Sequence, residues 1–297
     1  EAENLLQQAV ESWRELRKDR REGFQIVKLA FALDNLGVLR WMQGKTSEAT
    51  ALFQEGFQLL GDAQGIGEKS VRASLQTDYG GLLVMAGQVT KGEPLLRQSL
   101  QEYRKIFAQP RWEMGATLTM LGQAAAAGQN FDDAIQFLEE GEKVYRDTLG
   151  SSNSYVAYNL GQQAVVLSAR KDLKAAEEKA REAIATWRAI SPNGKLAPAD
   201  TCRTLAQILM KQNRSREAES YYRQAIAGYD SQAKKNYSAI VSLKLSLSQA
   251  LLAQKRAVEA ERIAHEASIE AEQNLGPENP MTNTAAQNLA TIRNQPH

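Results

Sequence analysis

Apolar and small residues recur at spacings of three and four along residues 204–229, TLAQILMKQNRSREAESYYRQAIAGY. They are Leu205, Ala206 and Leu209 in the first half, and Ala218, Tyr222, Ala225 and Tyr229 in the second. These spacings put each set on one face of a helix, and the polar run 211–214 separates the two sets. The pattern therefore predicts two short amphipathic helices joined by a tight turn. Helices this short bury too little apolar surface to be stable alone, so they need neighbours.

The same signature returns about every 42 residues. A small residue recurs at Ala49, Gly92, Ala134, Ala176, Ala218 and Ala260. A large residue recurs at Tyr103, Tyr145, Trp187 and Tyr229, with Leu60 and Ala271 in the equivalent places at the two ends. Self-similarity at a fixed period of this length predicts a stacked array of helix hairpins. The aromatic residues are expected to fill the core between neighbouring hairpins.

A second series of small residues precedes the first and is expected to face it within each hairpin. Its members are Gly37, Gly80, Gly122, Ala164, Ala206 and Ser248. Residues with little or no side chain let two backbones approach closely. In the fourth copy, the pair Leu160-Gly161 lies three residues ahead of the frame. Either Ala164 fills the small position there, or the first helix of that copy is shifted.

This pattern resembles the tetratricopeptide repeat family. The matching residues are Leu36, Gly37, Gly44, Ala49 and Phe53; Leu121, Gly122, Ala134 and Leu138; and Leu205, Ala206, Ala218, Tyr222 and Ala225. The usual family period is about 34 residues, and the longer period here is similar to the kinesin-light-chain type. The resemblance covers nearly the whole chain. It implies an all-α fold, a right-handed α-α superhelix, or solenoid, of stacked helix-turn-helix repeats.

The repeat frame predicts a single array over residues 1–297. Its parts are a half-repeat helix at 2–22, repeats at 30–72, 73–114, 115–156, 157–198, 199–240 and 241–282, and a capping helix at 281–294. Arrays need such terminal caps because an end repeat lacks one neighbour. The chain opens at Glu1 on what looks like the second half of a repeat. We therefore expect a fragment of a longer protein or a processed form.

Composition restricts the classes of function. The chain has 36 basic and 35 acidic side chains, a net charge of +1, which argues against nucleic-acid binding. No apolar run approaches the length of a membrane span, so no membrane contact is expected. The two histidines, His265 and His297, offer almost no material for a general base or a metal cluster. We therefore predict no catalytic residue, no metal site and no cofactor. The single cysteine, Cys202, does not indicate the redox compartment of the protein. A cytoplasmic location is favoured, and a periplasmic one stays open if a preceding segment carries an anchor.

Function is then expected in the surface that the array builds. In a twisted stack, the first helix of each hairpin lines the concave side. The inward positions of these helices define a candidate peptide-binding face: Phe31, Asp34, Asn35, Val38, Thr77, Thr119, Gln123, Tyr158, Gln162, Arg203, Gln207, Gln249 and Asn288. The set is neutral and rich in amides. Amides both donate and accept hydrogen bonds, which suits the main chain of an extended peptide.

The resemblance implies further detail about the ligand. Kinesin-light-chain-type repeats hold extended peptides with asparagines on their first helices, and Asn35 and Asn288 fall at such a position. The intervening copies carry other residues there: Asp78, Met120, Gln162, Thr204 and Ser246. Family members that grip a C-terminal carboxylate use lysines that this chain lacks at the matching positions. The identity of the ligand therefore stays open.

The leading hypothesis is a non-enzymatic scaffold that binds an extended segment of a protein partner in the concave groove. The alternative is a regulatory or sensor arm of a larger signalling protein, such as a bacterial Ser/Thr kinase, acting by self-association. A third class, an enzyme, would have to rely on His265.

Overall fold

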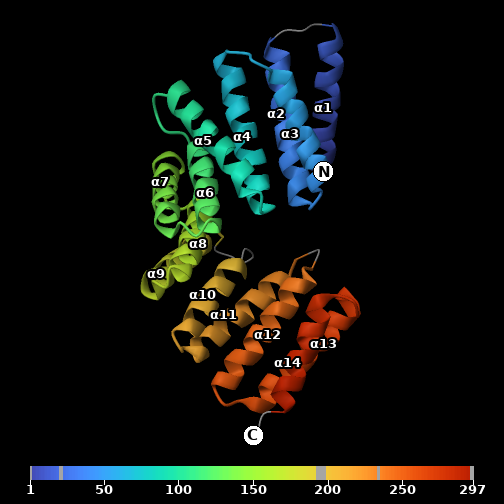
Figure 1. Ribbon diagram of the computed structural model, residues 1–297, viewed down its shortest axis with the longest axis vertical. Helices are drawn as coiled ribbons and strands as arrows, with labels where there is room; N and C mark the ends of the chain where they lie inside the picture. The colour runs from blue at the N-terminus through green and yellow to red at the C-terminus, as the bar shows by residue number, and fades with distance from the viewer. Residues whose placement is uncertain (1, 20–22, 192–198, 233–234, 295–297) are drawn as a thin grey trace. The chain divides into compact units, whose positions relative to one another are not determined.

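A computed structural model describes residues 2–19, 23–191, 199–232 and 235–294. These residues form fourteen α-helices and no strand, which confirms the predicted all-α repeat fold (Figure 1). The chain divides into two compact units, residues 1–150 and 151–297, and each is described by itself. Across the described ranges, every helix is too short or too polar to cross a bilayer.

The first unit is a stack of helix hairpins. It contains α1 (Ala2–Asp19), α2 (Gly23–Met42), α3 (Thr46–Leu60), α4 (Ile66–Met85), α5 (Val89–Ile106), α6 (Trp112–Ala127) and α7 (Phe131–Leu149). The pairs α2–α3, α4–α5 and α6–α7 form hairpins, and α1 packs on α2. The first helix of each hairpin also contacts the first helix of the next, α2 with α4 and α4 with α6. These first helices therefore form a continuous inner layer.

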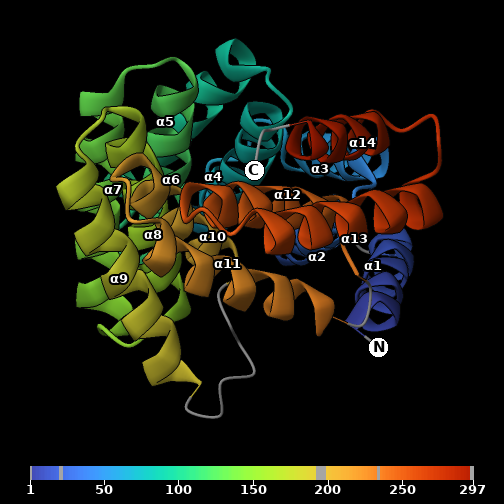
Figure 2. The ribbon, with the colours of Figure 1, turned by 90° about the horizontal axis from the view of Figure 1, so that it is seen from below.

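The second unit repeats this arrangement. It contains α8 (Ser154–Ala169), α9 (Leu173–Ile190), α10 (Ala199–Lys211), α11 (Ser215–Asp230), α12 (Tyr237–Ala253), α13 (Ala257–Leu275) and α14 (Pro280–Arg293). The hairpins are α8–α9, α10–α11 and α12–α13, and α8 contacts α10 as α12 contacts α14. In Figure 2 the chain turns back after α13 so that α14 packs beside it. Helices α8, α10, α12 and α14 are the first helices of this unit.

The predicted small residues are buried in each hairpin. A β-carbon on Gly92 would lie 2.5 Å from the Gly80 carbonyl oxygen, and one on Gly122 would lie 2.6 Å from Leu138 Cγ. Only glycine allows helices to approach this closely at those positions. Ala164 is fully buried, whereas Gly161 is half-buried. Ala164 therefore fills the small position in the fourth copy, the first of the two alternatives.

The turn within each hairpin has one geometry. The second residue after the first helix has a positive φ, between 61° and 78°, in all six: Gly44, Gly87, Gln129, Lys171, Asn213 and Lys255. The next amide bonds back to a carbonyl five residues earlier, as Lys45 N does to Arg40 O and Arg214 N to Leu209 O, both 2.9 Å. This left-handed residue ends an α-helix and satisfies its last carbonyls. Four of the six turns adopt it without glycine, so the stack imposes a conformation that those side chains disfavour.

Several helices begin before the predicted repeat boundaries. Helix α2 begins at Gly23 and α4 at Ile66, ahead of the boundaries at 30 and 73. The early turns are helical because their side chains reach the core: Ile26 and Val27 pack with the buried Val71. The predicted helix at 2–22 is described only to Asp19. Residues 20–22, residues 192–198 at the end of the predicted fourth repeat, and His297 lie outside the described residues. A single array over the whole chain stays a prediction.

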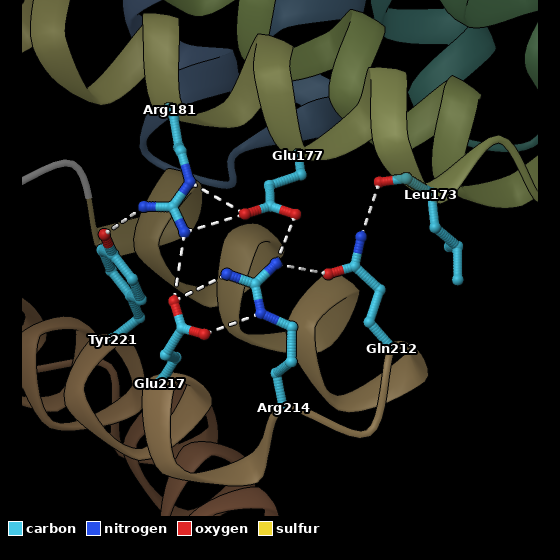
Figure 3. A network of polar contacts seen from close by, with 7 residues as sticks. All are labelled: Leu173, Glu177, Arg181, Gln212, Arg214, Glu217 and Tyr221. Carbon is cyan, nitrogen blue, oxygen red and sulfur yellow. Dashed lines mark hydrogen bonds and ion pairs between the residues drawn. The ribbon is translucent and has the colours of Figure 1, made fainter.

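Arginines tie one hairpin to the next in the second unit (Figure 3). Arg214, at the start of α11, donates to Glu177 on α9 at 2.6 Å and to Glu217 at 2.7 Å. Gln212, in the preceding turn, donates to the Leu173 carbonyl at 3.1 Å. Charge-assisted bonds of this kind are stronger than neutral ones. The turn of one hairpin is therefore fastened to the start of the second helix of the hairpin before it.

The same fastening recurs 42 residues later. Arg256 donates to Glu219 on α11 and to Glu259 on α13, both at 2.6 Å. Gln254 donates to the Ser215 carbonyl at 3.3 Å. Gln-x-Arg-x-x-Glu at the turn is thus a second repeated motif, specific to the last two hairpins.

Replacing Gly92 by alanine would place a methyl group against two backbone atoms, Gly80 O at 2.5 Å and Val84 N at 3.1 Å. Overpacking of this kind costs about 1–3 kcal/mol, against about 1 kcal/mol that alanine gains over glycine within a helix. We expect Gly92→Ala to lower the free energy of unfolding by about 1–2 kcal/mol, measured by urea denaturation followed by circular dichroism. Gly67→Ala is the control, because its new β-carbon comes no closer than 3.6 Å to Val27. An equal loss in both variants would contradict close helix approach as the cause.

Arg214→Met keeps the aliphatic stem and removes the guanidinium group that joins Glu177 to Glu217. The arginine side chain is 37% exposed, so we expect a loss of about 1 kcal/mol in unfolding free energy, at the upper end for exposed pairs. The loss should shrink at high salt. A double-mutant cycle with Glu177→Gln isolates the pair. Arg262→Met, whose ion pair with Glu266 lies within α13, is the control and should cost less. A salt-independent loss would rule out the ionic link.

Candidate functional site

The first helices α8 and α10 border a cavity of about 480 Å³ in the second unit, which we call the α8–α10 pocket. Three of the predicted peptide-binding residues line it, namely Tyr158 and Gln162 from α8 and Arg203 from α10. Val165 on α8 and Trp187 on α9 complete its apolar wall. The structure therefore brings together side chains from three helices that the sequence places up to 45 residues apart.

Local sequence explains how α8 presents these residues. The Asn153 side chain caps the helix by accepting from Tyr155 N at 2.8 Å. Spacings of three and four then place Tyr158, Gln162 and Val165 on one face. The opposite face is fixed by fully buried residues, Ala157, Leu160 and Ala164. The rotation of α8 is therefore determined by its core side.

The pocket exists because a contact found between other first helices is missing here. Successive first helices meet through polar pairs 40 residues apart: Ser74 Oγ donates to Asp34 Oδ2 at 2.6 Å, and the hydroxyls of Thr77 and Thr117 are 2.7 Å apart. At the α8–α10 contact the equivalent residues are Gly161 and Thr201. Among the described residues, a β-carbon on Gly161 would have only Thr201 Oγ1 within 4 Å, at 3.6 Å. The glycine leaves open the space that a side chain fills elsewhere.

The wall of the pocket is apolar and unusually exposed. Tyr158 is 41% exposed and Val165 47%. Trp187 is half-buried, whereas its repeat equivalents Tyr103 and Tyr145 are both 2% exposed. The prediction that the whole aromatic series fills the core is therefore wrong at Trp187. Two features of the sequence distinguish this copy. Its Leu160-Gly161 pair lies three residues ahead of the repeat frame, and it has Trp187 where three other copies have tyrosine.

The charges in the pocket are balanced internally. Arg203 and Asp200 form an ion pair at 2.7 Å. Tyr229 Oη donates to the same Asp200 carboxylate at 2.5 Å. Burial, together with this carboxylate, raises the pKa of Tyr229 to about 12, so the phenol stays a donor. Asp200 is thus neutralised by its own neighbours. Sequence reasoning missed Asp200 because its role depends on Tyr229, which comes from another helix.

The other predicted residues of the second unit lie along the same layer of helices. Gln207 on α10 and Gln249 on α12 are exposed. Asn288 on α14 is half-buried and accepts from Ser248 Oγ at 3.2 Å. Within the part of the chain that the structure describes, the Gln162 and Gln207 amides make no hydrogen bond. These two amides are available to a ligand.

The predicted residues of the first unit fall into two groups. Phe31 is 51% exposed on α2, and Asn35, Val38 and Gln123 are half-buried. The Asn35 amide donates to the Phe31 carbonyl at 2.8 Å, within its own helix. These four residues lie at the surface of the first helices, as a binding face requires.

Asp34, Thr77 and Thr119 form the second group and do not lie at the surface. Their exposed fractions are 2%, 5% and 1%. They share one place in the repeat, which we call the interface column: Asp34, Thr77, Thr119, Gly161 and Arg203. Adjacent residues on a helix point about 100° apart. Asp34 and Thr77 therefore point toward the neighbouring first helix, at the contacts α2–α4 and α4–α6. The next column, which contains Asn35 and Gln162, faces solvent in part. Placing Asp34, Thr77 and Thr119 on the peptide-binding face was wrong for this reason.

Comparison with known proteins agrees with this architecture. Residues 199–229, the hairpin α10–α11, match the family model of the tetratricopeptide repeat. That observation decides the fold. Residues 199–229 are a tetratricopeptide repeat. No curated protein matches the chain.

Solved structures with this tetratricopeptide fold resemble most of the chain. A signal-transduction ATPase with numerous domains and a tetratricopeptide repeat sensor, from Pyrococcus horikoshii, is 14% identical, with a TM-score of 0.71 over 98% of this chain and 43% of that one. BtubC (BKLC) from P. vanneervenii is 14% identical, with a TM-score of 0.59 over 94% and 92%. A putative kinesin light chain with nearly identical repeats, from Podosopora anserina, is 18% identical, with a TM-score of 0.57 over 69% and 97%. The predicted resemblance to tetratricopeptide proteins, kinesin-light-chain-like ones included, is confirmed.

Two carboxyl groups meet where the first helices of the first two hairpins pack, Asp34 on α2 and Asp78 on α4. Burial and the charge of Asp78 raise the pKa of Asp34 well above its usual range. Burial raises the pKa of Asp78 to about 7. Ser74 and Tyr103 also face this pair, and Glu113 lies near Tyr103. Buried carboxyls whose pKa values are raised in this way retain a proton near neutral pH. Asp34 therefore ties two helices together and does not contact a ligand.

The acid pair predicts a dependence of stability on pH. Both pKa values are raised in the folded state, so the stability that the pair contributes is present below the ordinary aspartate pKa of about 3.9. It is lost as pH rises through about 7. We expect the free energy of unfolding to fall between about pH 4 and 7, by at most about 1.4 kcal/mol per pH unit for one proton. The measurement is urea denaturation across this range.

Asp78→Asn should reduce the fall, because it removes the titration of Asp78 and the charge that adds to the effect of burial on the pKa of Asp34. Asp133→Asn, an exposed carboxyl in the first turn of α7, is the control and should keep it. The same fall in Asp78→Asn as in the original chain would exclude a shared proton.

Proposed function

We propose that the chain is a non-enzymatic scaffold that binds an extended segment of a partner protein along the first helices of its hairpins. In the second unit these are α8, α10, α12 and α14. The observation that carries the proposal is the α8–α10 pocket, which gathers Tyr158, Gln162 and Arg203 around an open cavity on that layer. The tetratricopeptide fold is itself a protein-interaction scaffold, which supports this class of function.

The chemistry of the face favours a peptide main chain. An extended segment presents one donor and one acceptor per residue, and a side-chain amide can satisfy both. Gln162, Gln207 and Gln249 lie on three successive first helices and are exposed or half-buried. The net charge of +1 offers no basic excess for nucleic acid. A neutral face of amides suits recognition through the main chain, with a side chain placed in the pocket.

A second candidate is a sensor or regulatory arm of a larger protein that acts by self-association. The Pyrococcus horikoshii ATPase favours it, because 98% of this chain matches less than half of a protein described as having a tetratricopeptide repeat sensor. Sedimentation equilibrium separates the two candidates, since a self-associating arm forms dimers or larger species without any peptide. A chain that stays monomeric at high concentration would count against the second candidate.

Peptide display against the whole chain tests the first candidate. We expect enriched peptides whose affinity falls at least about tenfold in the double variant Gln162→Glu, Gln207→Glu, because a carboxylate cannot donate to a peptide carbonyl and leaves it unsatisfied. Gln273→Glu is the matched control, the same change at an exposed position of the second helix α13. Equal loss in the control, or no enriched peptide, would overturn assignment of binding to the first helices.

A further inference from the structure

We propose that the α8–α10 pocket receives one large uncharged side chain of the bound segment, aromatic or aliphatic, and so sets its specificity. The inference rests on the proposed function, because it assumes that an extended segment lies along the first helices. It adds the chemical class of the residue that the segment must carry beside Gly161.

The apolar wall is the first argument. Tyr158 and Val165 are 41% and 47% exposed, whereas the aliphatic residues Val156, Leu160, Val166 and Leu167 of α8 are at most 5% exposed. Trp187 adds part of an indole ring to the same wall. Covering exposed apolar surface is favourable, and a ring placed beside aromatic side chains gains further contacts. The wall therefore attracts an apolar group.

Charge is the second argument. Among the described residues that line the pocket, the charged ones are Arg203 and Asp200, and they pair with each other. Asp200 also holds the Tyr229 hydroxyl. A charged side chain that entered the pocket would lose water without gaining an unpaired counter-charge, or would have to break this pair. The pocket therefore discriminates against acidic and basic side chains.

Size and rim chemistry are the third argument. A cavity of about 480 Å³ lies within the range of about 300–1,000 Å³ typical of ligand pockets. It can hold a large side chain together with part of the adjoining main chain. Gln162, Thr204 and Gln232 lie at the lining and can bond to that main chain. An extended segment thus gains main-chain bonds from the rim and an apolar contact from the wall.

The position of the pocket in the repeat is the fourth argument. The interface column carries Asp34, Thr77, Thr119, Gly161, Arg203 and Leu245 in successive copies. Glycine occurs there once. Asp34, Thr77 and Leu245 are buried and lie at the contacts α2–α4, α4–α6 and α12–α14. The specificity site is therefore confined to one copy, where that contact is left open.

Gly161→Leu tests the inference by filling the pocket from its floor. The fold should tolerate the change, because within the described ranges a β-carbon at Gly161 meets only Thr201 Oγ1, at 3.6 Å, and leucine favours helix over glycine. Gly161→Ala is the matched control, since it adds one methyl group and leaves most of the cavity. Urea denaturation should show both variants to be at least as stable as the original chain.

Random-peptide display is run on the original chain and on both variants. We expect the original chain and Gly161→Ala to enrich peptides with one position restricted to Phe, Tyr, Trp, Leu or Met. In Gly161→Leu that restriction should disappear, with affinity for the original peptides at least tenfold lower. No enrichment by the original chain would overturn the proposed function itself. Enrichment without this restriction, with a charged residue at the position, or unaltered by Gly161→Leu would overturn the inference alone.

Capped single residues give a second readout that does not need a selected peptide. N-acetyl-phenylalaninamide should shift the Trp187 indole NMR signal, identified by its loss in Trp187→Phe, and N-acetyl-aspartamide should not. The shift should be absent in Gly161→Leu and present in Gly161→Ala. A response to the acidic compound as large as to the aromatic one would contradict a pocket selective for uncharged groups.

Discussion

Each hairpin depends on two helix backbones that meet at residues with almost no side chain. At Gly80 and Gly92 the separation leaves no room for a methyl group, since a β-carbon on Gly92 would lie 2.5 Å from a carbonyl oxygen. Helices this close at one point must place their bulky residues elsewhere. Tyr103 and Tyr145 do so near the other ends of their hairpins, where both are buried. The same constraint that closes a hairpin therefore sends its large side chains against the next one, and stacking follows from it.

Stacking in turn determines what each first helix can present. One side of α8 is held by Ala157, Leu160 and Ala164, so its opposite side has a defined direction. Between these sides lies the interface column, which meets the neighbouring first helix. The exposed columns on either side of Gln162, those of Tyr158 and Val165, are then the surface on which recognition can occur. A binding face built in this way is rigid, because its rotation is determined by core packing.

The repeat frame could be predicted from the sequence because it rests on small residues in a fixed order. Gly37, Gly122 and Ala206 are all buried as expected, and the turn at Gly44 is where the frame places it. The rotation of each helix was harder to predict. A period of 42 residues identifies equivalent positions without saying which of two adjacent columns faces the groove, and adjacent residues point about 100° apart. Asp34 and Thr77 were therefore assigned to the surface, although both are buried between helices.

Contacts between helices could not be predicted from spacing at all. The Asp34–Ser74 and Thr77–Thr117 pairs depend on how far one hairpin rotates against the next, which is decided by packing. Asp200 and Trp187 belong to the pocket for the same reason. The sequence does contain one indication of the pocket. Gly161 occupies a position of the repeat that is polar in the three preceding copies. Once the repeat is known, a residue that departs from it is informative. Each copy places that position at the same kind of helix contact, so an unusual side chain changes the contact.

The interface column shows how one geometry takes different chemistry in each copy. At α2–α4 the column brings a carboxyl against Ser74 and Asp78, and burial makes the pair hold a proton. At α4–α6 it joins the hydroxyls of Thr77 and Thr117, which satisfy each other without charge. At α8–α10 it has no side chain, and a cavity remains. The three contacts join equivalent positions of the repeat, and they differ in the side chains placed there. A stack of helix hairpins can therefore gain a cavity where one contact lacks a side chain, as it does at Gly161 between α8 and α10.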